Sequence, residues 1–182
     1  MDLPETSRSL AEVLVSPLGN RWQHVQAVAH RALGLRRVAG LDDSDGDALV
    51  ASAWLHDIGY APEVKVTGFH ALDGARYLRA LEFPDRVVCL VAHHSGARFE
   101  AVERGLEREL AAFALEDSPV MDALIAADLT TGPDGTYCEF DQRIDEVLAR
   151  YPVGHPVHRT WTKARKEIGE SIVRTELRLS KT

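Results

Sequence analysis

The chain has 182 residues, of which 45% are hydrophobic and 27% charged, and its formal net charge is −7 at pH 7. This length predicts one domain, which can bury about 70% of the surface of its unfolded chain. The composition is typical of a globular protein, and the sequence lacks the run of about 20 apolar residues that a membrane span needs. The acidic net charge argues against a general nucleic-acid surface.

The cysteines and the first residues bear on cellular location. The two cysteines, Cys89 and Cys138, are too few for a disulfide framework, which is typical of a reducing compartment. The N-terminal stretch MDLPETSRSL lacks the basic and apolar regions of a signal peptide. We therefore expect a cytoplasmic protein.

Hydrophobic residues recur at helical spacing along most of the chain, and no segment shows the strict alternation of a strand. Breaks rich in glycine, proline and aspartate separate these segments at 40–47, at Pro84 and at 132–137. The predicted fold is all-α, a compact helical bundle formed by residues 1–182 as one domain. We predict helices over 18–35, 46–57, 70–82, 84–95, 98–114, 117–128, 140–150 and 156–178.

Polar side chains fall on the inward faces of the first predicted helices. His24 lies at the edge of an apolar stripe, whereas His30 falls on the opposite side of the same helix and is expected to be solvated. The apolar run AWL then leads directly into His56 and Asp57, on a helix that is apolar nearly all round. Both side chains are therefore predicted to point into the protein.

The later helices repeat this arrangement. His70 leads the apolar face of its helix. In RVVCLVAHHSG, His93 and His94 both lie beside apolar positions, and the helical register does not choose between them. In MDALIAAD, the apolar stripe is continued one turn later by Asp128, so a carboxylate is predicted to face the core.

One bound divalent ion would satisfy these inward polar groups together, whereas burying each without a partner would cost several kcal/mol. Imidazole and carboxylate suit Fe, Mn, Co or Zn, and the lack of a cysteine cluster argues against a thiolate zinc site. The structural alternative is that each group is a cap or a satisfied core residue, as isolated histidines and aspartates usually are. An ordered series on separate helices favours the metal. His155 and His158 have no carboxylate partner in this order, so we expect them in solvent or at a helix start.

The order of these residues resembles the HD-domain superfamily of metal-dependent phosphohydrolases, and HDIG at 56–59 is the signature of one branch. The resemblance covers about 20–130, which would form the metal-binding core, with helices in 140–178 packing on it. It implies a first metal held by four ligands. These are His24, His56, Asp57 and Asp128.

Superfamily members with additional histidines hold a second metal, and the aspartate of the doublet bridges the two ions. The stretches GFHALDGARYL and LVAHHSG resemble the segments that supply those histidines. The resemblance thus implies one or two ions, with His70 and His93 at the second site and His94 as a ligand or a substrate contact.

Tyr60 is a departure from the family pattern. Many HDIG members carry lysine directly after the glycine, and some nucleotidase members carry a nearby acidic residue that assists proton transfer. The chain also lacks the longer glycine-tyrosine-proline pattern of the cyclic dinucleotide phosphodiesterases, so that branch is not expected.

The predicted chemistry is phosphoester hydrolysis, because a metal with few protein ligands can bind both water and a phosphate oxygen and acidify the water. We predict Arg21 as the main phosphate contact, since its fork of donors suits phosphate, with Lys65 and Arg98 as weaker candidates. As a terminal rather than a bridging ligand, Asp57 is suited to accept a proton from water, and His94 is suited to protonate the leaving group.

Three functions are compatible with these residues. The leading one is a soluble phosphohydrolase that acts on a small phosphomonoester or a nucleotide. The second is a di-iron oxygenase, since some HD-fold proteins with a similar histidine set use dioxygen to cleave a carbon–carbon or carbon–phosphorus bond. The third is a non-catalytic sensor module, which the complete ligand series disfavours. No glycine-rich phosphate loop or aromatic base-stacking ladder identifies the substrate.

Overall fold

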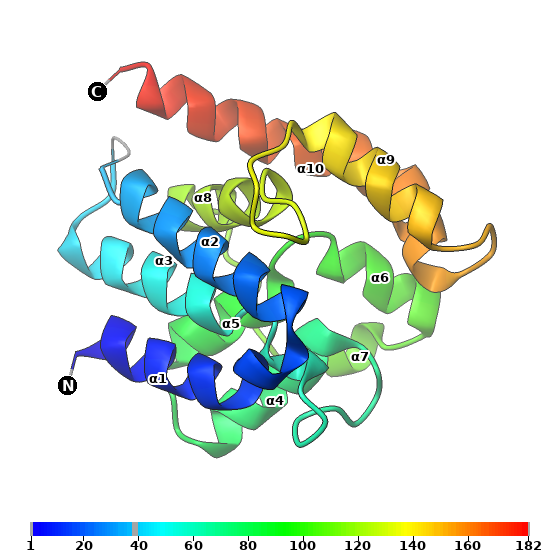
Figure 1. Cartoon of the computed structure of the whole chain (residues 1–182), viewed down its shortest axis with the longest axis horizontal. Coiled ribbons are helices and arrows are strands. Elements are labelled where there is room, and N and C mark those ends of the chain that lie inside the picture. Colours follow the sequence, from blue (N-terminus) through cyan, green and yellow to red (C-terminus); the bar gives the residue numbers. More distant parts are fainter. Residues whose placement is uncertain (1, 38–39, 182) are drawn as a thin grey trace.

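A computed structural model of the chain describes residues 2–37 and 40–181, and over these residues it is built from α-helices and two 3-10 turns (Figure 1). The described residues contain no strand, only an isolated bridge between Thr131 and Tyr137, so the predicted all-α fold is confirmed. The elements are α1 (Leu3–Val15), η1 (Ser16–Leu18), α2 (Asn20–Leu35), α3 (Asp43–Leu55), η2 (Ile58–Tyr60), α4 (His70–Ala80), α5 (Asp85–His93), α6 (Ala97–Arg104), α7 (Glu107–Leu110), α8 (Pro119–Leu129), α9 (Phe140–Arg150) and α10 (Pro156–Leu179).

Two helices differ from the prediction. Helix α1 lies in a region where no helix was predicted; Asp2 caps it by accepting a hydrogen bond from the Glu5 amide. The single helix predicted over 98–114 is wrong, because α6 ends at Gly105, which has a left-handed φ of 67°. The amide of this glycine bonds back to the carbonyl groups of Ala101 and Val102, which is a common helix ending.

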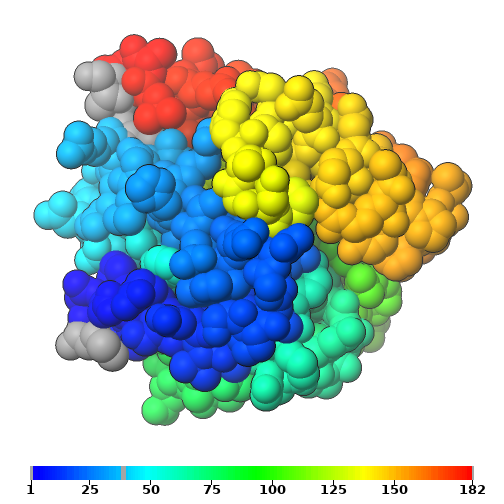
Figure 2. Space-filling view, viewed as in Figure 1, coloured from blue at the N-terminus to red at the C-terminus, as the bar shows by residue number. Residues whose placement is uncertain are grey.

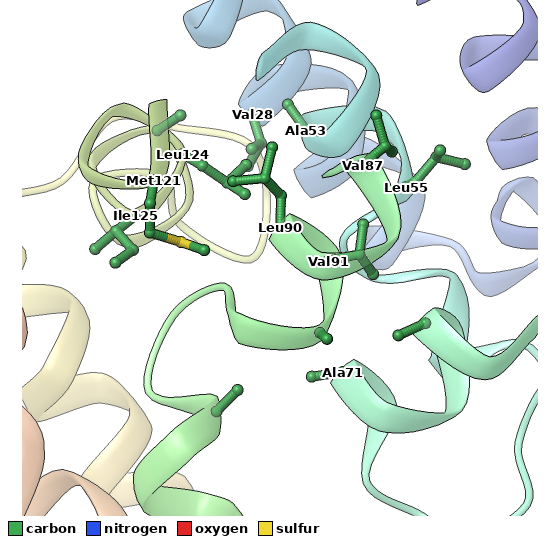
Figure 3. Close-up of a cluster of buried hydrophobic side chains, with 14 of the residues drawn as sticks. Val28, Ala53, Leu55, Ala71, Val87, Leu90, Val91, Met121, Leu124 and Ile125 are labelled. Carbon is green, nitrogen blue, oxygen red and sulfur yellow. The ribbon is translucent and has the colours of Figure 1, made fainter. Parts of the chain in front are cut away.

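Helices α3 and α8 form the centre of the molecule. Every residue of α8 from Val120 to Leu129 is buried, which explains why its sequence is apolar nearly all round. Helix α3 contacts α1, α2, α5 and α8. Figure 3 shows part of the resulting core, where side chains of five helices meet: Val28 of α2, Ala53 and Leu55 of α3, Ala71 of α4, Val87, Leu90 and Val91 of α5, and Met121, Leu124 and Ile125 of α8.

The last two helices cover the side of the core opposite α1 (Figure 1). Helix α10 packs on α8 and α6, and α9 packs on α10. The segment between α8 and α9, yellow in Figure 2, lies against α2, where Arg31 stacks over the Tyr137 ring at 4.7 Å. Within the described residues, no helix combines the length and the apolar character that crossing a bilayer requires.

Candidate metal centre

Three helices bring His24, His56 and Asp128 together in the interior. The Nε2 atom of His24 lies 3.1 Å from Oδ1 of Asp128 and 3.4 Å from Nε2 of His56. The Nε2 atom of His56 lies 3.8 Å from the same Asp128 oxygen. All three side chains are buried, and their donor atoms lie within 4.8 Å of one another.

Asp57 joins this first group to a second one. Its Oδ2 atom faces the first group, 3.5 Å from Nε2 of His56 and 3.8 Å from Nε2 of His24. Its Oδ1 atom lies 3.5 Å from Nε2 of His70, and that nitrogen lies 3.1 Å from Nε2 of His94. Asp57, His70 and His94 therefore form a second group of donor atoms, and the two oxygens of Asp57 point to different groups.

Backbone carbonyl groups orient the imidazoles of the first group. Nδ1 of His24 lies 3.0 Å from the Gly132 carbonyl, and Nδ1 of His56 lies 2.8 Å from the Ala53 carbonyl. Because a carbonyl only accepts, each Nδ1 carries the hydrogen, and a neutral imidazole then presents a lone pair at Nε2. The two Nε2 atoms and Oδ1 of Asp128 are thus three acceptors that face one another. A cation placed between them could bind all three.

The donor set fits a divalent ion. Atoms that bind one ion at about 2.1 Å lie roughly 3.0–3.4 Å apart at tetrahedral or octahedral angles. The separations between Nε2 of His24 and its two partners in the first group fall close to this range. A proton on His24 would satisfy one pair of these atoms at a time, whereas a metal ion would satisfy all three.

Burial and neighbouring charges keep His56, His70 and Asp57 in their metal-binding protonation states. Burial lowers the pKa of His70 to about 3 and also lowers the pKa of His56, so both imidazoles are neutral at pH 7. Burial opposes ionisation of Asp57, but the Arg21 charge and the neighbouring histidines outweigh it and hold the pKa of this carboxyl well below its usual value. Neutral imidazole and ionised carboxylate are the forms that bind metals.

The end of α3 explains how adjacent residues reach different groups. His56 still has helical backbone angles, but Asp57 leaves the helix at φ −105° and ψ 8° before the short turn η2. Gly59 follows because α4 passes very close: a Cβ atom there would lie 1.9 Å from the His70 carbonyl oxygen. The glycine thus allows the start of α4 to pack against η2, and this packing brings His70 next to Asp57.

A buried aspartate fixes the loop that leads into His70. The Asp73 carboxylate accepts hydrogen bonds at 3.0 Å from the amides of Val66, Thr67 and Gly68. Asp73 is 1% exposed, so a buried carboxylate anchors an exposed loop. The sequence pattern gave no sign of this role, since an aspartate in the first turn of a helix is ordinarily a surface residue.

A cavity of about 80 Å³ adjoins the two groups and is lined by Asp57, His70, His94 and Asp128. Arg21 lines it too and pairs with Oδ2 of Asp57 at 2.7 Å. The Arg21 guanidinium stacks over the Tyr60 ring at 4.1 Å, and the other ring contact of Tyr60 is with His70, at 4.3 Å between centroids. Tyr60, noted in the sequence as a departure from the family pattern, therefore holds a cation and an imidazole at the edge of the site.

Comparison with known proteins agrees with this geometry. A family model described as HD domain matches residues 21–126, which is more than half of the chain. The chain belongs to the HD domain family. The resemblance to the superfamily of metal-dependent phosphohydrolases is thereby confirmed. No curated protein and no solved structure matches the chain.

Not every residue predicted for the site of this HD domain lies there. His93 lies outside both groups, because its Nε2 bonds to the Phe113 carbonyl at 2.8 Å, and His94 takes the place expected for it. Lys65 is exposed and does not line the cavity. Arg98 is also outside the cavity and pairs with Glu167 on the surface at 2.6 Å.

The remaining histidines lie away from the two groups. His30 is exposed, as expected. His155 caps α10, where its Nδ1 accepts a hydrogen bond from the Val157 amide, in agreement with the predicted helix-start role. His158 lies in the first turn of α10 and is half-buried.

The sequence analysis gave no site role to the C-terminal helices, yet they line one wall of the cavity. Arg143 and Val147 come from α9, and Thr160 and Trp161 come from α10. Both helices lie beyond the residues that the HD domain model matches. Helical periodicity reports which face of a helix is buried, and it does not predict which distant segment that face contacts.

Proposed function

We propose that this HD domain is a metal-dependent phosphohydrolase that releases phosphate from a small phosphomonoester or a nucleotide. The observation that carries the proposal is the convergence of His24, His56 and Asp128 as three facing acceptors, with Asp57 shared by a second group. A divalent metal bound there would supply Lewis acidity toward a phosphate oxygen and acidify a water molecule.

In this proposal the chain contributes binding and orientation. Arg21 binds a phosphate oxygen, because its guanidinium lines the cavity and already contacts an anionic oxygen of Asp57 at 2.7 Å. Tyr60 limits where the guanidinium can move by stacking on it. Burial and Asp57 raise the pKa of the Tyr60 hydroxyl well above its ordinary value, so it stays protonated and can donate a hydrogen bond.

The positions of Asp57 and His94 favour roles as metal ligands. Nδ1 of His94 donates to the Val91 carbonyl at 2.6 Å, which leaves Nε2 as its free acceptor, and that atom faces His70. We therefore propose His94 as a ligand of the second group. Asp57 turns one oxygen to each group, so we propose it as the shared ligand. Both of its oxygens are then ligands and its pKa is held well below the usual value, so we do not assign it the proton-accepting role.

The competing function is a di-iron oxygenase, favoured by the same two groups that share Asp57, since iron accepts imidazole and carboxylate equally well. Elemental analysis of the purified protein would identify the ion. Phosphate release from a panel of phosphomonoesters is then measured in air and under argon. Release that needs a metal and proceeds equally under argon supports the hydrolase. Product formation only in air would overturn it.

A further inference from the structure

Helices α9 and α10 line the cavity together with residues of α2 and α4, and two of their polar side chains have unusual surroundings. Thr160 is 1% exposed and Arg143 is 7% exposed. The Thr160 hydroxyl and the Nε atom of Arg143 are both buried and have no hydrogen-bond partner. Both residues line the cavity beside the two metal-binding groups.

Other buried threonines of this protein do have hydrogen-bond partners, unlike Thr160. Thr175, on the same helix and 2% exposed, donates to the Ser171 carbonyl one turn earlier at 3.0 Å. Thr130 and Thr131 also donate to carbonyl groups four residues before them. An unsatisfied buried hydroxyl costs about 1–3 kcal/mol. A ligand oxygen that reached this hydroxyl from the cavity would remove this cost.

Thr160 also lies close to the histidine site. A Cβ atom added to Gly96 would lie 3.4 Å from the Thr160 methyl carbon, so the threonine packs on the turn that follows His94. Ser95, which lines the cavity in the same turn, has a left-handed φ of 56°. The α10 wall thus borders the turn that carries one of the second-group donors.

Arg143 presents a donor with a fixed position. Its Nη1 atom bonds to Glu146 on the same helix, which holds the guanidinium, and the same carboxylate also pairs with Arg150. The Nε–H group is left for another acceptor. A hydrogen-bonding oxygen of a substrate would suit both this donor and the Thr160 hydroxyl, which can donate or accept.

We propose that the α9–α10 wall binds the organic part of the substrate through its oxygen atoms and selects small hydroxylated phosphomonoesters over nucleotides. This inference rests on the proposed phosphohydrolase function. The cavity of about 80 Å³ is well below the 300–1,000 Å³ that drug-sized ligands occupy, so it is too small to hold a nucleoside beside the phosphate. Apolar walls of Val147 and Trp161 limit its width.

A nucleoside would need a different place. A larger hollow of about 520 Å³ shares Arg21, Tyr60 and Arg150 with the cavity but contains neither Arg143 nor Thr160. A nucleoside bound there would not contact Arg143 or Thr160. The experiment therefore compares a small hydroxylated ligand with a nucleotide.

The test is calorimetric titration of the manganese-loaded protein under argon with three probes. The first is 3,4-dihydroxybutylphosphonate, in which a methylene group replaces the ester oxygen of glycerol 3-phosphate. The second is the same type of analogue of AMP, and the third is inorganic phosphate. Because the analogues resist hydrolysis, binding is measured apart from turnover. We expect the dihydroxybutyl compound to bind about tenfold more tightly than phosphate and more tightly than the AMP analogue.

The variants locate the effect. T160V keeps the shape of the side chain and should weaken binding of the dihydroxybutyl compound about fivefold, with phosphate binding unchanged. R143K removes the Nε–H donor but keeps a charge for Glu146, and should act in the same direction. T175V is the matched control on the same helix: it should lower the melting temperature, because it breaks a satisfied hydrogen bond, and leave all three affinities unchanged.

Equal or tighter binding of the AMP analogue, or full retention of the preference in T160V and R143K, would overturn the inference. The phosphohydrolase proposal is judged separately, by phosphate release from glycerol 3-phosphate and AMP. Selective binding without release of phosphate from either ester would count against that proposal while leaving the α9–α10 assignment intact.

Discussion

Arg21 and Asp57 form an ion pair with 2.7 Å between Nη1 and Oδ2, and this Asp57 oxygen is the one that faces His24 and His56. The guanidinium therefore lies where it competes with a bound ion for that oxygen and where it can contact a phosphate next to the ion. R21Q separates these effects. We expect the variant to keep its metal content, because a competitor is lost, while kcat/KM for phosphate release falls about 10- to 100-fold.

R98Q is the control for this substitution, since Arg98 pairs with Glu167 on the surface and does not line the cavity. Its metal content and kcat/KM should equal those of the unmodified protein. A loss of metal in R21Q, or equal kinetics in R21Q and the unmodified protein, would remove Arg21 from the phosphate site.

The adjacent histidines His93 and His94 offer a matched pair. H94A should lose the ion of the second group, because Nε2 of His94 lies with Nε2 of His70 and a carboxylate oxygen of Asp57. H93A should keep every ion and lose about 1–3 kcal/mol of unfolding free energy, since its hydrogen bond to the Phe113 carbonyl is buried. Metal analysis and denaturant unfolding measure the two effects. The reverse pattern, with ions lost only in H93A, would exclude the assignment of His94.

Gly59 should not tolerate even a methyl group. Its added Cβ would lie 1.9 Å from the His70 carbonyl oxygen, and the three nearest atoms are all backbone atoms of His70, so G59A should cost several kcal/mol or prevent folding. Gly34 is the control, because it is exposed on α2 with nothing within 4 Å of an added Cβ. G34A should be stabilising by about 0.5–1 kcal/mol, through helix propensity and the unfolded chain. Thermal unfolding of both variants tests this prediction. An unchanged melting temperature for G59A would contradict the close packing of Gly59 against the His70 backbone.

Asp73 should act on the second group from a distance. D73N weakens the acceptor of three loop amides, so we expect a loss of about 1–3 kcal/mol in stability and weaker binding of the second ion only. Stepwise titration with Mn²⁺ reports the two affinities separately. Equal weakening of both ions would mean that the loop does not act through His70.

Much of this site can be predicted from helical periodicity, because its residues sit where apolar stripes meet polar groups. Asp128 is the clearest case: it continues the stripe of α8, and the structure places it in the interior facing His24. His24 similarly lies on the buried face of α2, whereas His30 on the same helix is exposed. In both helices the backbone is regular up to and beyond the polar residue, so the register holds.

Periodicity fails where a helix ends. Helix α5 stops at His93, and His94 has an extended conformation with ψ 158°, so the register that made the two histidines equivalent no longer applies. Ser95 then has a left-handed φ, which a serine in the sequence does not predict. The contributions of Arg143 and Thr160 were also beyond prediction, because they depend on how α9 and α10 fold back over the cavity.

The central claim is that Asp57 joins two groups of donor atoms that hold metal ions. The direct measurement is the number of ions per chain, by plasma emission spectrometry, in the unmodified protein and in a folded D57A variant after dialysis against Mn²⁺. The account predicts two ions for the unmodified chain and loss of both in D57A, since this variant removes an oxygen from each group. A folded D57A protein with its full metal content, or an unmodified chain that binds none, would contradict it.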